Sequence, residues 1–151
     1  KEMPDVKFFW VGGIPFKNLG ADYNAMQDII KNAPNNLTVT GVIPLENVRD
    51  YYVAADVFVL PAMQENHPMC VLEAAGAGLP IILRDIPQYN DTFKGDAVMA
   101  KTDDEFLELI SKLRKDKKAY KKAQLGAEKI AERFDSSAGA ERLVEFYRSL
   151  I

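Results

Sequence analysis

Two glutamates, Glu65 and Glu73, are the side chains of this sequence best suited to chemistry at a ligand site. They are eight residues apart in the run VFVLPAMQENHPMCVLEAAGAGLPIILR, which spans residues 57–84. We expect Glu65 in a polar loop and Glu73 in the short, small-residue helix that follows. Both carboxylates can then face one cleft at the carboxyl end of a parallel sheet, where open α/β sheets bind ligands.

The surroundings of Glu73 leave two interpretations open. The spacing alone proves little, because one such pair is unsurprising among ten glutamates. Glu73 is flanked by apolar residues on both sides, and a charge in apolar surroundings is costly unless it has a partner. Either Glu73 binds a ligand, or it is a carboxylate paired with a nearby arginine or backbone amide.

The loop at 64–68 leads into the start of that helix. Free backbone N–H groups and the positive end of the helix dipole suit such a position to a phosphate, although every α/β protein has helix starts of this kind. His67, the single histidine, could transfer protons there, but a plain loop histidine is the commoner case. A dyad of His67 with Cys70 is rejected, because no oxyanion partner is apparent and Cys70 opens an apolar helix.

Composition excludes several classes of function. The chain has 151 residues, enough for one domain with a buried core, and its net charge of -3 does not favour nucleic-acid binding. The basic residues between 114 and 122 are interleaved with Asp116, which favours a solvated helix face. The single cysteine excludes an internal disulfide and a cysteine-based zinc cluster, so we expect no metal and a reducing, cytoplasmic setting.

The sequence contains no apolar run long enough to span a bilayer, and the residues after Gly12-Gly13 match neither of two known glycine-rich motifs. No apolar run approaches the roughly 20 residues needed to span a bilayer. Gly12-Gly13 is followed by Ile14-Pro15-Phe16-Lys17, which contains neither the dinucleotide-binding glycine pattern nor a P-loop lysine. The sequence therefore predicts neither a dinucleotide-binding loop nor a P-loop at this position.

Hydrophobic periodicity predicts strands alternating with helices. We expect strands at 7–11, 37–40, 57–60, 81–83 and 97–100, and helices at 22–32, 46–55, 69–77, 103–113, 117–134 and 137–150. Thr102 or Asp103 can cap the helix at 103–113, and Ser136 or Ser137 can cap the last helix. Strands that are apolar throughout indicate a parallel sheet covered on both faces. The predicted fold is one Rossmann-like, doubly wound α/β domain with C-terminal helices. Gly41, after the second strand, either lets a base lie against Val42 and Ile43 or is a simple turn glycine.

Taken in order, three segments resemble the C-terminal, nucleotide-binding half of family-4 GT-B glycosyltransferases. They are FFWVGG, LTVTGVIPLENVRDYYVAADVFVLPAMQEN and ENHPMCVLEAAGAGLPII, within residues 6–100. The segment FFWVGGIPFKNLGADYNAM most resembles Gram-positive bacterial enzymes that glucosylate or galactosylate diacylglycerol lipids. The resemblance implies sugar transfer with retention of configuration, from a UDP-linked glucose or galactose that is a substrate rather than a cofactor.

The resemblance also implies roles for individual residues. Glu73 would bind the ribose hydroxyls and Glu65, the catalytic candidate, would lie near the donor sugar. The remaining implied contacts are the amides of Met69, Cys70 and Val71 with the diphosphate, the backbone of Gly41, Val42 and Ile43 with the base, and Asn66 and His67 with the sugar. Two departures stand out: Pro68 replaces a common glycine, and Ile86-Pro87-Gln88-Tyr89 replaces a usual Gly-Gly pair.

The same resemblance implies that the chain is a fragment. The family's diphosphate-neutralising Arg and Lys, and the N-terminal domain that holds the acceptor, would precede residue 1. We therefore expect a single nucleotide-sugar-binding domain over 1–151 that is inactive alone and meets its acceptor through the missing domain. The full enzyme would work at the inner face of the membrane, held there peripherally. The alternative is a non-catalytic Rossmann-like nucleotide-binding or interaction module, and a sugar-nucleotide epimerase or a phosphorylase ranks below both.

Overall fold

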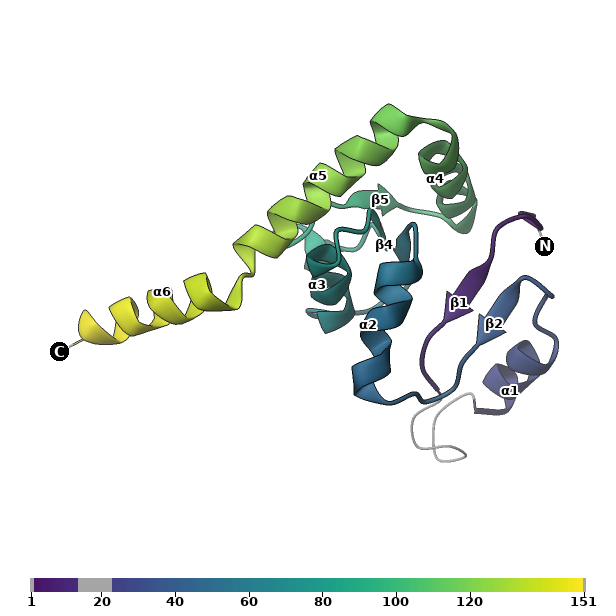
Figure 1. Ribbon diagram of the computed structural model, residues 1–151, viewed down its shortest axis with the longest axis horizontal. Coiled ribbons are helices and arrows are strands. Elements are labelled where there is room, and N and C mark those ends of the chain that lie inside the picture. The colour runs from purple at the N-terminus through teal and green to yellow at the C-terminus, as the bar shows by residue number, and fades with distance from the viewer. Residues whose placement is uncertain (1, 14–22, 151) are drawn as a thin grey trace. The chain divides into compact units, whose positions relative to one another are not determined.

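The protein consists of two compact units that divide between Val53 and Ala54. The structure, a computed structural model, describes residues 2–13 and 23–150. Residue 22, the first of a predicted helix, and the segment 14–17 lie outside the described residues. Figure 1 shows the helices and strands of both units.

The first unit contains a parallel pair of short strands. β1 (Phe8–Trp10) pairs with β2 (Leu37–Val39) in the register Phe8 with Leu37. The unit also holds α1 (Tyr23–Lys31) and the helix α2 (Leu45–Ala54) at its end. The Asn36 side-chain amide donates to the carbonyls of Met3 and Val6, at 2.9 and 2.8 Å, and so fastens the chain ahead of β1. No residue of 2–13 or 23–53 is buried.

The second unit is built on a three-stranded parallel sheet. Its strands are β3 (Phe58–Leu60), β4 (Ile81–Arg84) and β5 (Val98–Ala100), in the order β3-β4-β5. All four residues of the central strand β4 are buried, as expected for a strand covered on both faces. The parallel pairing and the alternation of strands with helices confirm the predicted α/β class.

Helices of the second unit pack closely around this sheet. α3 (Met69–Gly76) contacts α5 (Lys117–Arg133), and α4 (Asp103–Lys115) contacts both α5 and β5. At Gly126 of α5 a Cβ atom would lie 2.0 Å from the carbonyl oxygen of Asp96, so only glycine fits there. The predicted solvated basic face is confirmed, since the basic residues between 114 and 122 are all exposed.

Side-chain caps fix the starts of the C-terminal helices. Thr102 caps α4 by accepting from the Glu105 amide at 3.2 Å, which confirms one of two candidates. The prediction that Ser136 or Ser137 caps α6 (Ser136–Arg148) is wrong. The carboxylate of Asp135 is the cap, because it accepts from the amides of Ser137 and Ala138, both at 3.0 Å, while Ser136 already lies in the helix.

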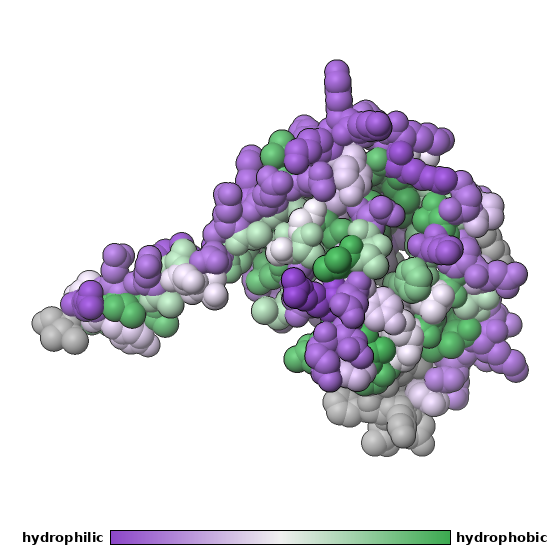
Figure 2. All heavy atoms as spheres, in the orientation of Figure 1, coloured by the Kyte–Doolittle hydropathy of each residue, from purple (hydrophilic) through white to green (hydrophobic). Residues whose placement is uncertain are grey.

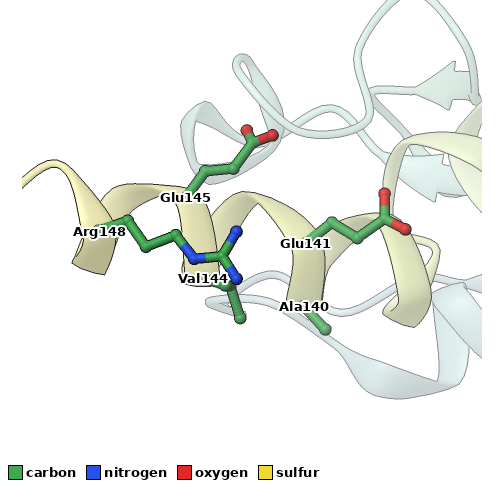
Figure 3. Close-up of a pocket in the computed structure, with 5 residues that line it drawn as sticks. All are labelled: Ala140, Glu141, Val144, Glu145 and Arg148. Atoms are coloured by element: carbon green, nitrogen blue, oxygen red, sulfur yellow. The ribbon is translucent and has the colours of Figure 1, made fainter.

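The last helix, α6, exposes an apolar face. None of its residues is buried, and Leu143 and Phe146 are more than half exposed. Figure 2 shows apolar side chains at the surface along this helix. A hollow of about 310 Å³ beside α6 is lined by residues of this helix alone. In Figure 3, Glu141 and Glu145 project from one side of the helix, and Ala140 and Val144 project from the other. One helix cannot enclose a ligand, so this hollow is not a candidate site.

Candidate functional site

The candidate site of the second unit lies where β3 ends and α3 begins. β3 stops at Leu60, an irregular loop covers residues 61–68, and α3 starts at Met69 with Pro68 as its N-cap. The loop therefore lies at the carboxyl end of a parallel strand, as the sequence predicts. Pro68 offers no side-chain cap, so the first amides of α3 depend on other acceptors.

One of the three amides expected to hold a diphosphate is already engaged. The Val71 amide donates to the Pro68 carbonyl at 3.1 Å. The amides of Met69 and Cys70 precede the first intrahelical bond of α3, as the first amides of any helix do. An anion at this helix start would therefore be held by two amides and the helix dipole.

The charges of both glutamates act on the thiol of Cys70. Burial raises the pKa of the Cys70 thiol, and the charges of Glu65 and Glu73 raise it further. Both carboxylates therefore lie within electrostatic reach of one thiol in the first turn of α3. A thiol held in its neutral form is a poor nucleophile, which agrees with rejecting a catalytic dyad with His67.

Glu73 does not lie in the apolar surroundings that its sequence neighbours suggest. It is exposed, whereas Val71, Ala74 and Ala75 of the same helix are buried. The cost of a buried charge therefore does not arise, because helical periodicity turns Glu73 away from those three residues, and both interpretations of its role stay open. Glu65 is half-buried in the loop.

His67 lies in an aromatic cluster. Its ring stacks on Phe93, with centroids 5.4 Å apart and planes 17° apart, and contacts Phe134 at 5.0 Å. The next loop residue towards β3, Asn66, is exposed. Through these contacts His67 anchors the loop to the end of α5. Its contact with a donor sugar remains a prediction.

Arg84 fixes the other end of the same loop. This buried guanidinium, at the carboxyl end of β4, donates to the carbonyls of Pro61 at 3.3 Å and Lys101 at 3.1 Å. Its third partner is the carboxylate of Asp103 at 2.6 Å. Nothing in the sequence run identifies Arg84 as an organiser of the loop, because its partners are distant in the chain.

The residues expected to contact a base belong to the first unit. Gly41 has a φ of 68°, which favours glycine, and a bridge joins it to Gly12. Val42 is 87% exposed and Ile43 is half-buried. The predicted turn is confirmed, whereas contact with a base remains a prediction.

Tyr89 is the site residue that sequence reasoning missed. Its side chain is 1% exposed, and its hydroxyl is buried with no hydrogen-bond partner in the described part of the chain. Burial raises the pKa of Tyr89 to about 12, and the charges of Glu65 and Cys70 contribute. The one signal in the sequence was that residues 86–89 replace a Gly-Gly pair usual in the resembled family, which indicated a changed wall of the sugar pocket.

The described residues form neither a metal site nor a membrane-spanning helix. Within 2–13 and 23–150, no group of three or more His, Cys, Asp or Glu side chains is arranged to hold a metal ion. Over the same ranges, no helix has the length and apolar character needed to cross a membrane.

The fold and the site define a class of protein. Parallel strands alternating with helices, followed by long C-terminal helices, match the C-terminal domain of GT-B glycosyltransferases. The chain belongs to the family described as "Glycosyl transferases group 1", which matches residues 1–116.

Named relatives give the chain a more specific context. It is 30% identical over 147 residues to the alpha-galactosylglucosyldiacylglycerol synthase of Streptococcus pneumoniae, covering 97% of this chain and 39% of that protein. It is 30% identical over 115 residues to the processive diacylglycerol alpha-glucosyltransferase of Acholeplasma laidlawii, covering 75% of this chain and 34% of that protein. The chain thus spans under two fifths of the length of these relatives.

A solved structure shows the same fold. Anabaena HepE, determined in complex with UDP-glucose, superimposes with a TM-score of 0.78 at 18% identity. The match covers 97% of this chain and 42% of HepE. At this identity the likeness shows the fold alone.

Proposed function

We propose that this chain is the donor-binding domain of a retaining glycosyltransferase. The enzyme moves a hexose from UDP-glucose or UDP-galactose to an acceptor, with a diacylglycerol lipid as the acceptor class. The observation that carries the proposal is the placement of Glu65 in the loop after β3 and of Glu73 on α3, with the first amides of that helix between them in the chain. The similarity to two diacylglycerol glycosyltransferases supports the choice of acceptor, and HepE, which shares the fold, binds UDP-glucose.

The site chemistry fits a nucleotide sugar. A diphosphate carries negative charge, which the dipole of α3 and the amides of Met69 and Cys70 can stabilise. Ribose and hexose hydroxyls donate hydrogen bonds, which the carboxylates of Glu73 and Glu65 can accept. In this assignment Glu73 binds the ribose and Glu65 lies beside the donor sugar.

The remaining assignments complete the proposed site. Asn66 and His67 border the sugar, and His67 takes part only as far as its stacking on Phe93 allows. We propose that the backbone at 41–43, where Gly41 has a positive φ, contacts the base. We also propose that 1–151 act as one donor-binding domain, although the chain folds as two compact units.

We propose that transfer needs groups beyond those described at this site. The leaving diphosphate must be stabilised as the sugar–oxygen bond breaks, and preorganised positive charge is the usual means. Two helix amides provide only part of that stabilisation. We therefore propose that the chain alone binds donor without transferring sugar, and that the complete enzyme works on the cytoplasmic side of the membrane, with its acceptor held by another domain.

An amide NMR titration of the chain with UDP and then GDP tests the proposal. We expect shifts centred on residues 41–43 and 69–73 that are larger for UDP. Equal shifts with both nucleotides would contradict the choice of base. Shifts elsewhere would contradict the site, and sugar transfer by the chain alone would contradict its proposed inactivity.

A further inference from the structure

The hydroxyl of Tyr89 is the least satisfied buried polar atom in the described part of the chain. It is the one buried side-chain nitrogen or oxygen there without a hydrogen-bond partner. Buried hydroxyls are rarely left unpaired, because burial removes their water without replacing it. A native structure that keeps such an atom has a reason for it, such as a partner that arrives in another state of the site.

The backbone around Tyr89 fixes where its side chain points. The short turn of helix Pro87–Tyr89 follows β4, and the Tyr89 carbonyl accepts from the amides of Phe93 at 3.0 Å and Lys94 at 2.9 Å. The phenol ring meets Phe93 edge to face, with centroids 5.3 Å apart and planes 71° apart. The ring is therefore held firmly while its hydroxyl stays unpaired.

The groups near that hydroxyl are those of the candidate site. Besides burial, the charge of Glu65 and then that of Cys70 raise the pKa of Tyr89. The Cys70 thiol carries that charge only in alkali; near neutral pH it is protonated and is a weak acceptor. The Glu65 carboxylate is the strong acceptor within electrostatic reach, and it belongs to the irregular loop, where it is half-buried.

A ligand cannot reach the buried hydroxyl itself, whereas it can reach Glu65. The loop that carries Glu65 is fastened at one end by the bond from Arg84 to Pro61, and near the other by the stacking of His67 on Phe93. Phe93 also contacts Tyr89, so the loop and the phenol share a support. A change of the Glu65 side chain between these fixed points would present its carboxylate to the hydroxyl.

We propose that Tyr89 is a positioning residue whose hydroxyl donates a hydrogen bond to the Glu65 carboxylate when a nucleotide sugar occupies the site. The bond holds one carboxylate oxygen, so that the other faces the sugar. This inference rests on the proposed function, and it concerns the sugar rather than the nucleotide. Tyr89 takes no part in binding UDP alone.

A double-mutant cycle tests the proposal in the protein at its full natural length. The four proteins are the wild type, Tyr89→Phe, Glu65→Gln and the double variant, and calorimetry measures their dissociation constants for UDP-glucose and for UDP. We expect each single change to weaken UDP-glucose binding about tenfold, as for the loss of a bond to a charged group, and to leave UDP binding unchanged. The double variant should bind no more weakly than Glu65→Gln, because Tyr89 acts through Glu65.

The outcomes separate this inference from the proposed function. If the wild type binds both ligands and Tyr89→Phe binds UDP-glucose equally well, the inference is overturned and the function stands. Additive losses in the double variant also overturn it. A wild type that binds neither ligand overturns the proposed function and the inference with it.

Tyr120→Phe is a matched control from another part of the same unit. The Tyr120 hydroxyl donates to the Asp56 carbonyl at 3.0 Å. Its removal should lower Tm and leave UDP-glucose binding unchanged, whereas Tyr89→Phe should weaken binding without lowering Tm, because no bond is lost in the unliganded protein and an unpaired buried hydroxyl is removed. The reverse pattern would make Tyr89 a structural residue.

A second measurement leaves Tyr89 intact. The NMR signal of the ring carbon that bears the Tyr89 hydroxyl should shift when UDP-glucose is added to the wild type, and should not shift when UDP is added. The shift should disappear in Glu65→Gln. A shift that persists in Glu65→Gln overturns the role of Glu65 as the acceptor.

Discussion

Arg84 and Asp103 form an ion pair in which one partner is buried and the other is exposed. The Arg84 Nη2 and the Asp103 Oδ1 are 2.6 Å apart, and their side chains are 10% and 85% exposed. The guanidinium also lies over the Phe106 ring, 5.0 Å from its centroid. The pair connects the carboxyl end of β4 to the start of α4, beside the loop that carries Glu65.

Replacing either partner should therefore have unequal effects. Arg84→Met removes the side chain that donates hydrogen bonds to two backbone carbonyls. This change should lower the free energy of unfolding by about 2–4 kcal/mol. Asp103→Asn should cost about 1 kcal/mol or less, because its carboxylate is in water. Chemical denaturation of both variants measures the difference, and equal losses would contradict the account.

Glu73→Gln should weaken UDP binding by about 1–3 kcal/mol, because a bond to a ribose hydroxyl loses its charged acceptor. Tm should not fall, since Glu73 is exposed. Calorimetric titration with UDP measures the change. Glu108→Gln, at an exposed position of α4, is the control, and an unchanged affinity in Glu73→Gln would remove Glu73 from the site.

The contact of Gly126 with Asp96 makes this glycine intolerant of any side chain. Gly126→Ala would place a Cβ atom 2.0 Å from a backbone oxygen, and α5 would have to move, at a cost of about 1–3 kcal/mol or more. Gly139→Ala in α6 meets no atom within 4 Å and should stabilise that helix by up to about 1 kcal/mol. Thermal unfolding compares the two, and a neutral Gly126→Ala would contradict the packing described here.

The raised pKa of Tyr89 predicts a loss of stability in alkali. The folded state favours the neutral phenol, so its contribution is fully present below the ordinary pKa of 10.0 and is lost as the pH rises towards about 12. The difference corresponds to about 2–3 kcal/mol. Unfolding of the wild type and of Tyr89→Phe at pH 9 to 12 measures it. The variant should lose less stability over this range, and parallel curves would contradict the assignment.

The sequence predicted what depends on local patterns and missed what depends on distant contacts. The strands, the helices and the Thr102 cap follow from periodicity and capping chemistry that lie within a few residues. The cap at Asp135 was missed because a serine and an aspartate compete for adjacent positions. The partners of Arg84 and the unpaired hydroxyl of Tyr89 could not be predicted, because both arise where segments distant in the chain meet.

The uneven distribution of buried residues has a thermodynamic consequence. Within the described ranges every buried residue lies beyond Val53, whereas Trp10, the one tryptophan of the sequence, is in β1. Because the heat capacity change of unfolding comes mainly from apolar surface newly exposed to water, calorimetry reports chiefly on residues 54–150. Tryptophan fluorescence reports on the other unit. The two methods therefore report on different units of one chain, and a comparison of their midpoints measures whether the two units unfold in one step.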